Sequence, residues 1–219
     1  PELVDYPFYQ FPNEDHLEAV KHFPNGKVLV FGYGSLMNHE SALRSVKPEA
    51  VDTMQKAVAF GVKRIFNYKA TKTDHWGPNQ HAREKAMLNL TQTLNISSVA
   101  NGVIMEVDAE DFSRLVKRET GYDLVPILVA RWDDVVSHNP KVVIEVAYTF
   151  TAVHELRNHI DYTSTKYYPV RGYMHTIQAA ARNYGDDFVE MWNATTYLAD
   201  GTTSVEDWDE ETFDGILCT

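Results

Sequence analysis

The chain has 219 residues, a formal net charge of −11 at pH 7 and 44% hydrophobic residues. This length and composition predict one folded domain with appendages, and they exclude a disordered or collagen-like protein. Cys218 is the only cysteine, which excludes an intramolecular disulfide and a multi-cysteine zinc site. A reducing compartment suits such a chain, and we expect a cytoplasmic protein.

The charge balance also bears on partners. The 31 acidic residues outnumber the 20 basic ones, so the chain should repel a phosphate backbone, and nucleic acid is not an expected partner. The longest apolar runs, such as 27–31, are far shorter than the roughly 20 residues that cross a bilayer, so no membrane-spanning segment is expected. The sequence leaves the oligomeric state open.

The predicted elements begin after an N-terminal extension, residues 1–26, which contains one short helical stretch over 15–22. A β-branched run at 28–31 predicts a buried strand, and a helical pattern follows over 39–46. Between 50 and 67 apolar residues alternate with others, which predicts a single long and curved strand.

The second half of the chain mixes strands and helices. Residues 69–85 lose all periodicity and are expected to form a functional or flexible loop. Further strands are expected at 86–92, 99–107, 124–132 and 142–150, and helices at 108–118, 170–184 and 187–197. We therefore expect an α/β (α+β) domain over 27–199, followed by an acidic tail over 200–219 that is mobile or lies on the surface.

The sharpest local motif lies where the first strand ends, at Gly32-Tyr33-Gly34-Ser35-Leu36-Met37. Two glycines and a serine in such a turn bare backbone N–H groups that can hold a carboxylate or phosphate. Dinucleotide-binding and NTP-binding loops are excluded, because the required glycine at Met37 and a Gly-Lys-Ser/Thr segment are absent. Taken alone, such a motif is more often a plain strand-to-helix turn.

A second motif, Arg118-Glu119-Thr120-Gly121-Tyr122, lies between a predicted helix and an apolar strand. A carboxylate walled by the sheet and by Tyr122 would be desolvated, so its pKa would rise and it could carry protons near neutral pH. The alternative is a solvated helix-end glutamate paired with a neighbouring arginine.

In order and context, these motifs resemble the γ-glutamylcyclotransferase-like family, which includes the glutathione-acting ChaC branch. The resemblance covers residues 27–185. It is carried by four segments, which are Tyr33-Gly34-Ser35-Leu36, Lys63-Arg64-Ile65-Phe66, Arg118-Glu119 with Gly121-Tyr122, and the helix pattern from Pro169 to Gly185. Val116 stands where the family commonly has aspartate, and the spacer between Glu119 and Gly121 is one residue shorter than in the ChaC form.

The resemblance implies a strongly curved mixed β-sheet, or small barrel, with flanking helices. It also implies cyclisation of a γ-glutamyl compound, such as glutathione, a γ-glutamyl amino acid or a γ-glutamyl amine, to 5-oxoproline. Glu119 would be the catalytic base, and the substrate would be bound by Tyr33, Gly34, Ser35, Leu36, Arg64, Tyr122 and Tyr168. The altered surroundings of Glu119 leave a non-catalytic binding or interaction module on the same fold as the alternative.

Nine histidines raise the question of a metal site. His154 and His159 are five residues apart, which does not place both rings on one helix face, and His75 and His81 lie in the aperiodic loop. Since the histidines and carboxylates nowhere show ligand spacing, we expect neither a metal nor another cofactor.

Overall fold

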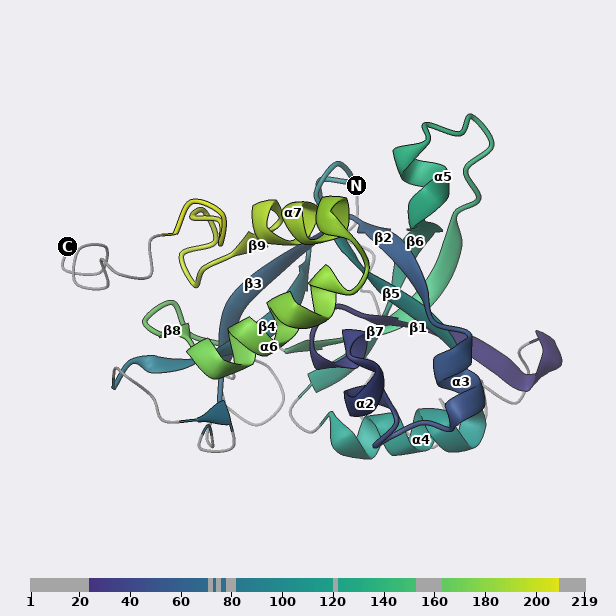
Figure 1. Ribbon diagram of the computed structural model, residues 1–219, viewed down its shortest axis with the longest axis horizontal. Helices are drawn as coiled ribbons and strands as arrows, with labels where there is room; N and C mark the ends of the chain where they lie inside the picture. Colours follow the sequence, from purple (N-terminus) through teal and green to yellow (C-terminus); the bar gives the residue numbers. More distant parts are fainter. Residues whose placement is uncertain are drawn as a thin grey trace, which may run out of the picture.

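In the computed structural model the described residues, 24–70, 73, 76–77, 82–119, 122–152 and 163–208, form two β-sheets with flanking helices (Figure 1). Five strands close into a barrel in the order β1-β5-β2-β6-β7. Their bounds are Lys27–Gly32 for β1, Gln55–Phe60 for β2, Val99–Asp108 for β5, Tyr122–Arg131 for β6 and Glu145–Ala152 for β7. The predicted α/β fold with a curved mixed sheet that closes into a small barrel is confirmed.

The second sheet has the order β8-β4-β3-β9 and lies beside the barrel (Figure 1). Its strands are Val62–Lys69 for β3, Glu84–Gln92 for β4, Tyr168–Pro169 for β8 and Thr196–Tyr197 for β9. Strands β3 and β4 form an antiparallel pair, whereas the short strands β8 and β9 are parallel to their neighbours.

Closure of the barrel fixes the place where β1 ends. Strand β1 runs antiparallel to β5 from Lys27↔Asp108 to Gly32↔Val103, and it meets β7 in parallel at Val30↔Tyr148. Gly32 therefore leaves the barrel between these two neighbours, and the segment that follows it lies over the barrel end.

The single long strand expected over 50–67 is wrong. Residues Pro48–Asp52 form helix α3, and the remainder is divided between β2 in the barrel and β3 in the second sheet. Gly61 separates the two strands at a φ of 68°, a left-handed conformation that glycine adopts readily. The apolar alternation continues across this turn, so periodicity alone did not reveal the change of sheet.

The helices pack on two sides of the barrel (Figure 1). One group, with α2 (His39–Ala42), α3 and α4 (Ala109–Arg118), packs against a buried cluster that includes side chains of β1 and β5. The other group, α6 (Arg171–Arg182) and α7 (Asp186–Ala194), covers the second sheet and β5. The remaining elements are α5 (Trp132–Val136) and two 3-10 turns, η1 (Pro24–Gly26) and η2 (Ser35–Met37).

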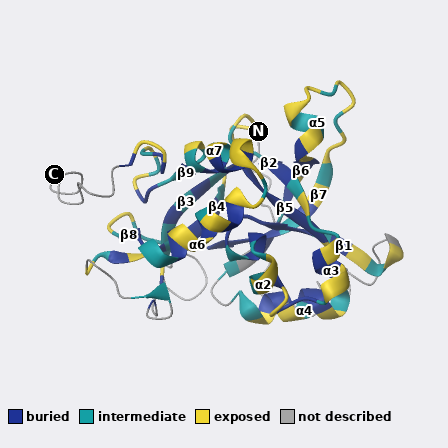
Figure 2. Ribbon diagram, viewed as in Figure 1, coloured by how far each residue is buried: buried dark blue, intermediate teal, exposed yellow. Residues whose placement is uncertain are grey.

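The buried residues form two clusters. On the ribbon, the residues coloured as buried follow the strands and parts of the helices (Figure 2). Helix α4 buries Phe112, Leu115 and Val116, and the side chain of Asp108 caps its N-terminus. Helix α6 buries Tyr173, Ile177 and Ala181, the periodic positions of the predicted helix.

The packed region continues beyond the boundary expected at residue 199. Val205 and Trp208 belong to the main buried cluster, and Tyr197 forms a bridge with Ser204. The first part of the acidic segment is therefore laid against the domain. The helix expected over 15–22 lies outside the described residues, as does the end of the tail.

Candidate functional site

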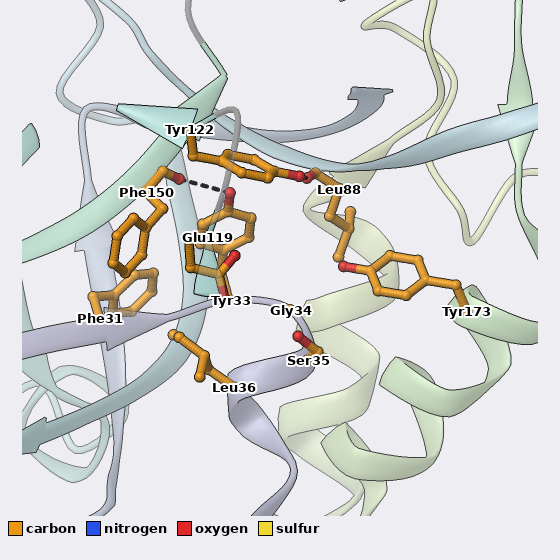
Figure 3. Close-up of a pocket in the computed structure, with 11 residues that line it drawn as sticks. Phe31, Tyr33, Gly34, Ser35, Leu36, Leu88, Glu119, Tyr122, Phe150 and Tyr173 are labelled. Atoms are coloured by element: carbon orange, nitrogen blue, oxygen red, sulfur yellow. Dashed lines mark hydrogen bonds between the residues drawn. The ribbon is translucent and has the colours of Figure 1, made fainter. Parts of the chain in front are cut away.

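A small pocket lies at the end of β1, between the barrel, strand β4 and helix α6 (Figure 3). The segment after β1, residues 33–36, forms its floor and is called the 33–36 loop below. The lining residues are Phe31, Gly32, Tyr33, Gly34, Ser35, Leu36, Leu88, Glu119, Tyr122, Phe150 and Tyr173.

The 33–36 loop turns directly into η2, where the N–H of Met37 donates to the carbonyl of Gly34 at 2.9 Å. The first N–H groups of such a turn have no partner within it, so they remain available to a ligand. A Cβ on Gly34 would lie 2.8 Å from the hydroxyl oxygen of Tyr173. A larger residue at position 34 would therefore require the loop or the Tyr173 ring to shift.

Glu119 follows helix α4 directly and serves as its C-terminal cap, with its N–H donating to the carbonyl of Leu115 at 2.9 Å. Its side chain is only 19% exposed. Burial raises the pKa of the Glu119 carboxyl, and the positive charge of Arg118 opposes that rise. The carboxyl is thus placed for proton transfer, with a pKa moved toward neutrality.

Three tyrosines share the pocket with this carboxyl, and their side chains point into the same space (Figure 3). The Tyr33 hydroxyl donates to the carbonyl of Phe150 at 2.7 Å, and the Tyr122 hydroxyl donates to the carbonyl of Leu88 at 2.9 Å. Burial raises the pKa of Tyr33, Tyr122 and Tyr173, so all three remain protonated near neutral pH. Because Tyr33 and Tyr122 have each used their one proton, their oxygens can only accept a hydrogen bond from a ligand.

The structure brings six of the eight predicted site residues to one pocket. Glu119 contributes its carboxyl and Tyr122 its ring, and the other four form the loop, namely Tyr33, Gly34, Ser35 and Leu36. The loop after the first strand and Glu119, which are far apart in the sequence, therefore line the same pocket. Thr120 and Gly121, which complete the motif, lie outside the described residues, as do His75 and His81.

Arg64 does not line the pocket, which corrects its expected contact with substrate. Its side chain is fully buried, and its guanidinium donates to Asn101, Thr195 and Thr196 and to the carbonyl of Trp192. Burial lowers its pKa to about 9, which leaves a cation at neutral pH. With its donors bound to neutral acceptors, Arg64 joins β3 to β5 and to the end of α7.

Tyr168 is also absent from the lining. It lies in β8, 5% exposed, with its N–H donating to the carbonyl of Arg83 at 2.9 Å and its ring beneath the Arg83 guanidinium. Its place at the outer edge of the second sheet explains why it does not close the pocket.

Sequence reasoning missed several contributors to the site. Tyr173 was recognised only as part of the buried face of a helix, and Leu88 and Phe150 only as strand residues, although all three line the pocket. Their positions depend on contacts between distant elements, which periodicity does not reveal. The reach of Arg118 toward Ser35, at 3.0 Å from the serine oxygen, was likewise not anticipated.

Two further properties hold for the residues that the structure describes. In that part of the chain, His, Cys, Asp and Glu side chains nowhere gather in a group of three or more that could hold a metal ion. Among the described helices, none is both long and apolar enough to cross a membrane.

Comparison with solved structures identifies the fold. A γ-glutamyl cyclotransferase superimposes with a TM-score of 0.55 at 14% identity, over 77% of this chain and 88% of the other. YkqA from Bacillus subtilis superimposes with a TM-score of 0.55 at 16% identity, over 84% of this chain and 60% of YkqA. A yeast γ-glutamyl cyclotransferase described as specific to glutathione superimposes with a TM-score of 0.50 at 12% identity, over 78% of this chain and 97% of the yeast chain.

These likenesses show that the chain has the γ-glutamyl cyclotransferase fold. No protein-family model matches the sequence, and no curated protein matches it.

Proposed function

We propose that this protein is a γ-glutamyl cyclotransferase, which converts a γ-glutamyl compound into 5-oxoproline and a free amine. The fold supports this proposal, but the observation that carries it is local. The partly buried carboxyl of Glu119 lines the same small pocket as the 33–36 loop, with tyrosine oxygens beside it.

The reaction needs little from the protein beyond positioning and one base. The α-amine nitrogen of the substrate attacks its own γ-carbonyl carbon, which forms the lactam bond and breaks the bond to the departing amine. Glu119 takes a proton from the α-ammonium group, which frees the amine to attack, and the same nitrogen loses a second proton as the lactam forms. Glu119 passes these protons in turn to the leaving nitrogen, which departs as an ammonium group. Atoms and charges balance within the substrate, and no co-reactant is required.

The pocket offers complementary groups for the ends of a glutamyl moiety. The N–H groups at the start of η2 suit its α-carboxylate. The oxygens of Tyr33 and Tyr122, whose protons already bind backbone carbonyls, suit its α-ammonium group. Holding both groups fixes the amine close to the γ-carbonyl, and such positioning replaces a large part of the barrier to cyclisation.

Glutathione, a γ-glutamyl amino acid and a γ-glutamyl amine such as γ-glutamyl-lysine are the candidate substrates. The yeast protein described as specific to glutathione makes glutathione the first compound to test. The partner that we propose is therefore a small molecule, and the acidic net charge argues against nucleic acid. The scarcity of cysteine favours the cytoplasm as the compartment.

A non-catalytic binding module on the same fold is the second candidate. The observation in its favour is the contact of 3.3 Å between Arg118 and Glu119, because a purely structural glutamate at a helix end would form the same ion pair.

One assay separates the two candidates. The protein is incubated with each of the three compounds, and 5-oxoproline is measured over time. A cyclotransferase releases 5-oxoproline and amine in equal amounts from at least one compound. A binding module yields none from any of them, even where calorimetry detects binding.

A further inference from the structure

The guanidinium of Arg118 touches both halves of the pocket. Arg118 is the last residue of α4, and its Nη2 donates to the Ser35 hydroxyl at 3.0 Å. Its Nε lies 3.3 Å from the Glu119 carboxylate. One planar group thus spans the distance between the 33–36 loop and the proposed base.

Two further serines hold this guanidinium from the side away from Glu119. Nη2 also donates to the Ser41 hydroxyl at 2.8 Å, and Nη1 donates to the Ser45 hydroxyl at 3.1 Å. Both serines belong to the segment of α2 and the turn after it. Since their hydroxyls are neutral, they orient the arginine without neutralising its charge.

We propose that Arg118 is a positioning residue. It fixes the 33–36 loop and the Glu119 carboxylate relative to each other, and it supplies the positive charge beside that carboxylate. The inference rests on the proposed cyclotransferase function, because it assigns Glu119 the role of base. A lysine cannot reproduce it, since a single ammonium group lacks the planar fork that reaches Ser35, Ser41 and Glu119 together.

The groups that face Glu119 support this electrostatic role. Tyr33 from the 33–36 loop, Tyr122 from β6 and Tyr173 from α6 line the same pocket as the carboxyl, and burial raises their pKa values, so they stay neutral. The cation of Arg64 acts on Tyr33 and Tyr173. Among the described residues, Arg118 is the charged group that acts on the pKa of Glu119, and it lowers that pKa against the effect of burial.

The test compares Arg118→Gln and Arg118→Lys with wild type, with Arg114→Gln as a matched control. Arg114 lies one turn earlier on α4, where it pairs with Glu110 and Asp111 away from the pocket. Two readouts are taken. The first is the titration of Glu119 by carboxyl carbon NMR, with its signal assigned by loss in Glu119→Gln, and the second is the pH profile of kcat/KM.

In Arg118→Gln the Glu119 titration should move to higher pH, and the acidic limb of the profile should move with it. Activity at neutral pH should fall about 10- to 100-fold and recover partly as the pH rises. Arg118→Lys should keep the limb close to that of wild type but lower kcat, because the charge remains while the fork is lost. Arg114→Gln should change neither readout.

An unchanged Glu119 titration in folded Arg118→Gln, or full activity in both Arg118 variants, would overturn the inference. If the wild-type protein releases no 5-oxoproline, the proposed function fails. The titration still decides whether Arg118 governs the Glu119 carboxyl.

Discussion

At the scale of single residues, Glu119 lies where its charge is unfavourable. Burial raises its pKa above the ordinary 4.5, so the folded protein binds this proton more tightly than the unfolded chain does. The associated stability is complete below about pH 4.5 and is lost as the pH rises through the folded value. At neutral pH, where the carboxyl must ionise in a buried place, its burial therefore costs stability.

We therefore expect Glu119→Gln to be at least as stable as wild type at neutral pH. The difference in melting temperature between the two proteins should grow as the pH rises from 4.5, because only wild type must ionise a buried carboxyl there. Calorimetry from pH 4 to 8 measures this. A Glu119→Gln protein that is clearly less stable at pH 7 would show that the carboxylate has mainly a structural role.

Gly34 allows a second prediction at the same scale. In Gly34→Ala the new Cβ would lie 2.8 Å from the Tyr173 hydroxyl oxygen, so the loop or the ring must move. We expect kcat/KM to fall about 10- to 100-fold, with little change in melting temperature, since the displaced groups line the pocket.

A Tyr173→Phe background provides the control, because it removes the clashing oxygen. The loss caused by Gly34→Ala should be smaller there than in wild type. Equal losses in both backgrounds would mean that this contact does not set the loop position.

At the scale of elements, helix α4 carries the proposed base to the pocket. Asp108 accepts the Asp111 N–H at 2.8 Å and the Lys47 ammonium at 2.7 Å, which anchors the start of the helix. Glu119 caps the other end. The orientation of the carboxyl therefore depends on the helix as a whole.

Asp108→Ala should lower the free energy of unfolding by about 1 kcal/mol through loss of the cap. Asp108→Asn should lose less, since its side-chain oxygen can still accept from Asp111. The Asp111 N–H and the Lys47 ammonium group lower the pKa of Asp108. The stability that the Asp108 carboxylate contributes is therefore present at neutral pH, and it is lost as the pH falls through that lowered pKa. Urea titrations at pH 7 and pH 3 measure this, and equal differences between Asp108→Ala and wild type at both pH values would contradict it.

The elements also show where periodicity is informative. The apolar faces of α4 and α6 and the cap at Asp108 were predictable, because helix spacing and capping are local properties. The division of 50–67 into α3, β2 and β3 was not, because Gly61 reverses the chain without interrupting the apolar alternation.

At the scale of the whole molecule, the same distinction applies to the site. The loop and Glu119 could be recognised from their motifs, which carry the family resemblance. Tyr173 could not, because it reaches the pocket only through the packing of α6 on the loop. Arg64 is the opposite case. Its motif led us to expect a contact with substrate, but its buried side chain links the second sheet to the barrel through hydrogen bonds to Thr196 and Asn101.

Arg64 should accordingly matter for folding. Arg64→Met removes the buried donors to the carbonyl and side-chain oxygens of Asn101, and we expect a loss of roughly 3 kcal/mol or more in the free energy of unfolding. Chemical denaturation measures it. A variant with wild-type stability and a changed KM would instead return Arg64 to the substrate.

The central claim is that Glu119 moves the proton during cyclisation, and one comparison tests it directly. Turnover of the preferred γ-glutamyl compound is measured for Glu119→Gln and for Glu106→Gln, a control at an exposed glutamate that is paired loosely with Lys27 at 3.8 Å. We predict a fall in kcat of roughly 10²- to 10⁴-fold for Glu119→Gln, with ligand affinity nearly unchanged, and no loss for Glu106→Gln. Wild-type turnover by a folded Glu119→Gln protein would contradict the account.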